Sequence, residues 1–147
     1  MKSPISDVLR SKGERTLTTS PDCTVAEAVS LMNEAGFGSV TVLDGGRLAG
    51  IFTERDVLAR VIDAQRDPAT TLVDEVMTPD PLCIGPDALV EDVIVLITEN
   101  HCRHLPVVED GSLVGLISIG DLMRWVVRDQ DRRIDAMLRA MRVVSHD

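Results

Sequence analysis

Residues 48–56 are Leu-Ala-Gly-Ile-Phe-Thr-Glu-Arg-Asp, and residues 113–121 are Leu-Val-Gly-Leu-Ile-Ser-Ile-Gly-Asp. Both segments place a hydroxyl residue three positions after a glycine and an aspartate three positions after that. An offset of 65 residues aligns Pro21–Val61 with Pro86–Val126 without a gap. Glycine, proline and aspartate stay in step over this length, which indicates an internal duplication. Two copies predict a pair related by a pseudo-twofold axis rather than a longer array.

Each copy has the same predicted order of elements, β-α-β-β-α. Helices are expected at 25–34 and 90–100, because apolar residues recur there at i, i+3, i+4 and i+7. Asp-Gly turns at 44–46 and 110–111 lie between β-branched runs and indicate two hairpins. The other strands and helices are expected at residues 17–19, 40–43, 48–53 and 54–62, and in the second copy at 82–84, 105–108, 113–118 and from 120 onward.

The predicted fold class is therefore α+β, with two pseudo-twofold-related repeats packed through their sheets and flanking helices at both ends. One copy of about 50 residues buries too little apolar surface to be stable alone, so a shared core is expected. The expected divisions are an N-terminal helical segment (1–15), the first repeat (16–63), a linker with a short helix (64–76), the second repeat (77–127) and a C-terminal helical extension (128–147).

The C-terminal extension has an apolar stripe at helical spacing. Such a stripe either docks on its own domain or contacts a partner, and the sequence leaves both open. The stripe consists of Ile134, Met137, Leu138 and Met141.

Composition excludes several classes of function. The 147 residues carry a net charge of −9, which disfavours nucleic acid as a partner, and three aromatic residues are too few for a base-stacking platform. We expect no membrane span and no export signal, hence a cytoplasmic protein. The three cysteines are too few for a disulfide framework or a zinc site and are expected to be small core residues.

The repeated Thr/Ser-x-x-Asp motif has two interpretations. A hydroxyl residue followed three residues later by an acid is a capping box, which would only start the last helix of each repeat. The same geometry suits a nucleotide, because a helix N-terminus attracts phosphate and a carboxylate accepts hydrogen bonds from a ribose diol.

The chain resembles a tandem pair of cystathionine-β-synthase (CBS) domains, the Bateman module, over roughly residues 8–127. The resemblance rests on GIFTERD and GLISIGD, on SVTVLD and HLPVVED, on the two Pro-Asp pairs and on VMTPDP. It implies adenosine-type ligands (AMP, ADP, ATP or NAD(H)) in clefts between the repeats, and a homodimer arranged as a flat disk. Small stand-alone bacterial two-CBS proteins are the most similar kind.

The resemblance also implies roles for individual residues. Asp56 and Asp121 would hold ribose hydroxyls, and Thr53 and Ser118 would contact ribose or phosphate. The adenine of each cleft would lie against the opening strand of the other repeat. Those strands are Leu82, Cys83 and Ile84 for the Asp56 cleft, and Leu17, Thr18 and Thr19 for the Asp121 cleft.

The two clefts are predicted to differ in charge. Arg103 and His104 stand where family members often bind phosphate, and Arg55 replaces the Gly120 of the second motif. The Asp56 cleft is therefore expected to gather three basic residues and to bind nucleotide more tightly, whereas the Asp121 cleft is expected to lack matching charge.

These observations predict a non-catalytic regulatory module that binds an adenine nucleotide and signals to a separate, unknown protein. The alternative is a structural or dimerisation module without a physiological ligand. No nucleophile–base pair, P-loop or metal cluster is recognisable, so we expect neither enzymatic activity nor a metal.

Overall fold

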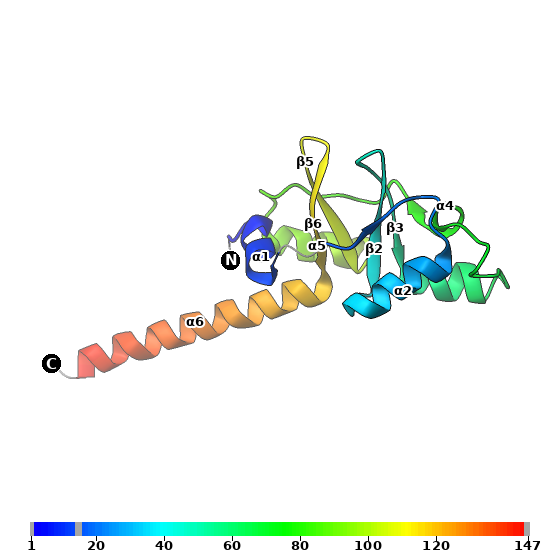
Figure 1. The fold of residues 1–147 in the computed structure, drawn as a ribbon. Coiled ribbons are helices and arrows are strands. Elements are labelled where there is room, and N and C mark those ends of the chain that lie inside the picture. Colours follow the sequence, from blue (N-terminus) through cyan, green and yellow to red (C-terminus); the bar gives the residue numbers. More distant parts are fainter. Residues whose placement is uncertain (1, 14–15, 146–147) are drawn as a thin grey trace.

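A computed structural model of the chain describes residues 2–13 and 16–145 (Figure 1). The first part contains α1 (Ile5–Lys12), β1 (Thr18–Thr19), α2 (Val25–Ala35), β2 (Ser39–Asp44), β3 (Arg47–Thr53), α3 (Glu54–Asp56) and the π-helical turn η1 (Val57–Ile62). The second part contains α4 (Val73–Val76), β4 (Thr78–Pro79), α5 (Val90–Asn100), β5 (His104–Glu109), β6 (Ser112–Ser118) and α6 (Ile119–Ser145). The predicted α+β class and the two repeats are confirmed.

Each repeat is organised around one antiparallel hairpin, β2–β3 or β5–β6, as the Asp-Gly turns predict. Both residues at each turn have positive φ: 58° and 83° at Gly45 and Gly46, and 51° and 79° at Asp110 and Gly111. Such a turn matches the twist of the flanking strands, which is why glycine and aspartate occur there. The hairpins lie beside each other, with β3 in contact with β6 (Figure 1).

The two sheets are not equally complete. In the first repeat β1 pairs parallel with β2 and β4 pairs antiparallel with β3, giving the order β1-β2-β3-β4. In the second repeat the strand expected at 82–84 is reduced to a single parallel bridge between Ile84 and Val107. Prolines at positions 81 and 86 limit backbone pairing on both sides of this bridge.

The two short helices are exchanged between the repeats. Ile5 and Val8 of α1 are buried in the core of the second repeat, and Val73 and Val76 of α4 are buried in the core of the first. A backbone hydrogen bond from the first residue of α5 or α2 holds the segment just before each exchanged helix. The Val90 amide donates to the Ser3 carbonyl at 2.9 Å, and the Val25 amide donates to the Thr71 carbonyl at 2.9 Å. Each repeat therefore completes its core with a helix that precedes the other repeat in sequence.

The last helices of the repeats differ. The first repeat has only α3 and η1, whereas α6 continues for 27 residues and extends beyond the body of the protein (Figure 1). Its apolar stripe does not dock on its own domain: Ile134, Met137, Leu138 and Met141 are 50–65% exposed. Of the two alternatives for this stripe, contact with a partner is the one that this structure leaves open. Among the described residues, no helix has the length and apolar character needed to cross a bilayer.

The cysteines depart from their expected role as core residues. Cys23 and Cys102 are half-buried and pack against the cores of the first and second repeat. Cys83, however, is exposed, because the segment around it does not form the expected strand.

Candidate functional site

The Asp121 carboxylate is fixed at the start of α6 by a capping box. The Ser118 amide donates to Asp121 Oδ2 at 2.9 Å, and the Asp121 amide donates to Ser118 Oγ at 3.1 Å. Thr53 and Asp56 form the same pair of bonds at the start of α3, at 3.0 and 3.3 Å. The capping interpretation of the motif is thus confirmed in both repeats, and it leaves the rest of each carboxylate for other partners.

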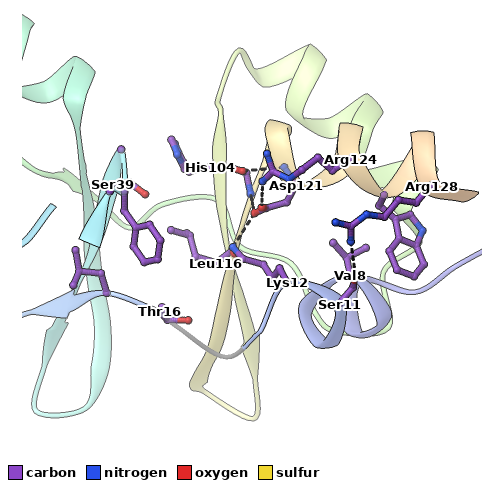
Figure 2. A pocket seen from close by; sticks show the side chains of 16 residues that line it. Val8, Ser11, Lys12, Thr16, Ser39, His104, Leu116, Asp121, Arg124 and Arg128 are labelled. Atoms are coloured by element: carbon purple, nitrogen blue, oxygen red, sulfur yellow. Dashed lines mark hydrogen bonds and ion pairs between the residues drawn. The ribbon is translucent and has the colours of Figure 1, made fainter. Parts of the chain in front are cut away.

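Two cations from different helices meet at the Asp121 carboxylate. Lys12 Nζ, at the end of α1, lies 2.8 Å from Oδ2, and Arg124 Nη2 lies 2.7 Å from Oδ1 (Figure 2). Burial acts to raise the pKa of Asp121, which is only 7% exposed, but the hydrogen bonds from Lys12 and Ser118 outweigh burial and hold the pKa below its usual value. The carboxylate is therefore ionised at neutral pH, with its charge shared between two helices.

A cavity of about 560 Å³ opens beside this carboxylate, between the two repeats. Thr16, Ser39 and neighbouring residues of the first repeat lie across it from Asp121 (Figure 2). The volume falls within the range of about 300–1,000 Å³ that is typical of small-molecule sites. Apolar and aromatic side chains complete the wall: Val8, Leu17, Phe37, Leu116 and Trp125.

His104 lines the same cavity from β5 (Figure 2). Burial lowers its pKa below the usual 6.5, although the charges of Asp121 and Glu54 oppose this effect. The imidazole is therefore neutral at physiological pH and offers the cavity a hydrogen-bonding group without a full charge.

Asp56, the counterpart of Asp121, has a different environment. It is 6% exposed, its Oδ1 lies 3.7 Å from Arg60 Nε, and it accepts a 3.5 Å hydrogen bond from Thr78 Oγ1. Arg60 in turn donates to the Met77 carbonyl at 2.8 Å, which ties η1 to the end of α4. Asp56 does not line the 560 Å³ cavity. Its described partners therefore serve the internal structure of the first repeat.

Comparisons with known proteins agree with this duplicated architecture. The sequence pattern described as "CBS domain" matches residues 5–63 and 73–128. The chain belongs to the CBS-domain family.

Individual CBS proteins resemble the chain over most of its length. The mitochondrial CBS domain-containing protein CBSX3 of Arabidopsis thaliana is 36% identical over 92% of this chain and 71% of its own. CBS domain-containing protein YhcV of Bacillus subtilis (strain 168) is 37% identical over 71% of this chain and 74% of its own. Among solved structures, a putative signal-transduction protein with CBS domains from Burkholderia ambifaria MC40-6 superposes with a TM-score of 0.83 at 37% identity, covering 87% of this chain and 96% of that one.

Only some of the residues predicted for the two CBS clefts come together. Leu17, Ser118, Asp121 and His104 line one cavity. Gly120 adjoins it, since a Cβ there would lie 3.5 Å from Arg124 Nη1 and 3.6 Å from Ser118 Oγ. Thr18 is exposed and Thr19 lines a separate cavity beside α2.

The residues expected around Asp56 are dispersed. Arg55, Arg103 and Leu82 are exposed, Cys83 lines a shallow cavity near the hairpin turns, and Ile84 is half-buried beside β5. Thr53 is occupied in the cap of α3. The expected gathering of Arg55, Arg103 and His104 at one cleft is not observed, because His104 lines the Asp121 cavity whereas the two arginines are exposed and do not line it.

The prediction that the Asp121 cleft lacks charge to match the Asp56 cleft is wrong. Lys12, Arg124 and Arg128 all line it, and none of them belongs to the repeated motif. Arg124 and Arg128 follow Asp121 at i+3 and i+7, a spacing that places them on one face of α6 and could have indicated their role. Lys12 could not be found this way, because the exchange of α1 brings it to the site. Among the described residues, no group of three or more His, Cys, Asp or Glu side chains is placed to hold a metal ion.

Proposed function

We propose that this protein is a regulatory module that binds a phosphorylated adenosine in the Asp121 cavity and reports its occupancy to a separate protein. Tandem CBS domains are generally regulatory, nucleotide-binding modules, which supports the class of function. The cavity is the observation that supports this choice of site, because one ionised carboxylate and three cationic side chains line it between the two repeats.

The chemistry of the cavity suits the parts of a nucleotide. The Asp121 carboxylate is the acceptor for ribose hydroxyls, as acidic residues are in other nucleotide folds. Phe37, Trp125 and the aliphatic side chains of the wall offer apolar surface to the base. The ligand would contact the two repeats and also the helices α1 and α6. It would therefore stabilise the relative arrangement of these elements to which it binds more tightly.

Asp121→Asn tests this proposal, with Asp56→Asn as the matched control. Titration calorimetry with AMP, ADP, ATP and NADH should show wild-type binding of at least one of them. Asp121→Asn is expected to weaken it by about 10–100-fold, because a hydrogen bond to a charged group contributes roughly 1.5–3 kcal/mol. Asparagine keeps the shape of the side chain and its capping oxygen, so the fold should persist.

The control separates the two clefts. Asp56→Asn is expected to bind like the wild type. The reverse pattern, with the loss confined to Asp56→Asn, would move the site to the first repeat. No binding by the wild-type protein at millimolar nucleotide would leave the alternative function, a structural module in which both carboxylates only cap helices.

We also propose that the module forms a homodimer through the faces of η1 and the first turns of α6. Leu58 and Ile62 on η1 are 65% and 58% exposed, and the residues 65 positions later, Met123 and Val127, are 43% and 56% exposed. The duplication thus repeats an apolar pair at the surface of both halves. Exposed apolar patches of this kind are typical of protein interfaces, and twofold dimers are the commonest assembly.

Sedimentation velocity tests the dimer. The double variant Leu58→Glu/Met123→Glu should be a monomer at concentrations where the wild type is a dimer, because it buries two carboxylates in the proposed interface. Val95→Glu is the control, since Val95 is also exposed (53%) but lies on α5; it should remain a dimer. Dissociation by Val95→Glu alone would place the interface elsewhere.

A further inference from the structure

The cavity beside Asp121 is more basic than the protein that surrounds it. Its described lining contains three basic side chains, Lys12, Arg124 and Arg128, against one carboxylate, a net formal charge of +2. The whole chain has a net charge of −9. Cations gathered in a concave site focus a positive potential that attracts anions. An unbalanced positive cavity in an acidic protein therefore indicates an anionic ligand.

The cations follow the carboxylate in order along α6. Asp121 is in the first turn, and Arg124 and Arg128 lie three and seven residues later on the same face. At a rise of 1.5 Å per residue, they are displaced from Asp121 by about 4.5 and 10 Å along the helix axis. A ligand whose sugar contacts Asp121 would extend its phosphates past Arg124 toward Arg128. A chain of phosphates would meet the two arginines in turn.

Ribose binding also has a consequence for Lys12. A carboxylate offers about four lone-pair positions, and Asp121 already uses three, for Lys12, Ser118 and Arg124. A ribose diol needs two acceptors, so one cation must leave the carboxylate when the sugar binds. Lys12 Nζ is also held by the Leu116 carbonyl at 2.8 Å, so it can stay in the cavity after the exchange. The released ammonium then needs a new anion within reach.

We propose that Lys12, Arg124 and Arg128 form a polyphosphate subsite, and that Lys12 transfers from Asp121 to the phosphates when the sugar occupies the carboxylate. The inference rests on the proposed function and narrows its ligand to a nucleoside di- or triphosphate. Arg128 now donates only to Ser11 Oγ among the described residues, at 3.1 Å, and is otherwise without a charged partner there (Figure 2). Since Ser11 and Lys12 belong to α1, ligand binding would alter the contacts that hold α1 to α6.

Calorimetric titrations with adenosine, AMP, ADP, ATP and inorganic tripolyphosphate test the subsite. In the wild type, ADP and ATP should bind more tightly than AMP, and AMP more tightly than adenosine. Arg128→Gln should weaken the binding of ADP, ATP and tripolyphosphate by about tenfold, because one charge-assisted hydrogen bond is lost, and should leave the binding of adenosine unchanged. Lys12→Gln should weaken the binding of the same three ligands. It should not weaken the binding of adenosine, because the substitution removes the Lys12 ammonium from the Asp121 carboxylate. Arg139→Gln, an exposed position farther along α6, is the matched control and should behave like the wild type.

The outcomes separate this inference from the proposed function. If nucleotides bind and depend on Asp121, but Arg128→Gln and Lys12→Gln leave ATP binding unchanged, the subsite is overturned and the proposed function stands. If both variants weaken adenosine as much as ATP, their role is only to hold α1 against α6, and the subsite is also overturned. If tripolyphosphate binds in the predicted pattern and adenosine and AMP do not bind, the subsite stands and the nucleotide assignment fails. Absence of binding by every ligand overturns both.

Discussion

Replacement of Ile5 by alanine is expected to lower the free energy of unfolding by about 2–5 kcal/mol, the usual cost of removing a buried isoleucine side chain. Ile5 is fully buried, and its neighbours belong to the second repeat, among them Val90, Val93 and Leu105. Ile5 lies on α1, which precedes the first repeat, so sequence order alone would not place it in the core of the second. The large effect is a direct consequence of the exchange of α1.

The single tryptophan makes this prediction measurable. Trp125 packs against the same core as Ile5, so its fluorescence during urea unfolding reports on the second repeat. Arg10→Ala, an exposed substitution on α1, should change stability by less than about 0.5 kcal/mol. If Ile5→Ala unfolds at the same urea concentration as Arg10→Ala, α1 does not contribute to the core of the second repeat.

Replacement of Phe52 by alanine should cost about 3–5 kcal/mol, because a fully buried aromatic ring is removed from the core of the first repeat. The Trp125 signal should shift by the same amount as the circular dichroism signal, although Trp125 belongs to the second repeat. Neither repeat is expected to be stable alone at about 50 residues, and the exchanged helices make each depend on the other.

Two probes in one experiment decide whether the repeats are coupled. Coincident transitions by fluorescence and circular dichroism, both displaced in Phe52→Ala, are the expected result of two-state unfolding. An unchanged fluorescence transition with a separate, earlier loss of circular dichroism would show instead that the repeats unfold independently. In that case a ligand between them could not be expected to stabilise both.

The local structure was predictable from sequence because its causes are local. The Asp-Gly turns determine both hairpins, and the apolar period determines α2 and α5, whose observed bounds differ from the predicted ones by at most one residue. The Thr/Ser-x-x-Asp motifs predict the caps of α3 and α6, which form as expected.

The composition of the site was less predictable because its causes are not local. Lys12 reaches Asp121 across 109 positions of sequence, through an exchange of helices that no periodicity reveals. The place of His104 in the repeat predicts that it lies at the Asp56 cleft, but its side chain lines the Asp121 cavity together with residues of the first repeat such as Ser39. The repeat therefore indicated two equivalent carboxylates, and the structure places only Asp121 beside the cationic cavity.

We propose that the Asp121 cavity holds a nucleotide between the two repeats. The most direct test is a crystal structure of the protein grown with saturating ATP. We expect density for a ribose within hydrogen-bonding distance of Asp121, with phosphates extending along α6 toward Arg128. A nucleotide bound only at Asp56, or a cavity without ligand density when ATP is saturating, would show that the Asp121 cavity is not the nucleotide site.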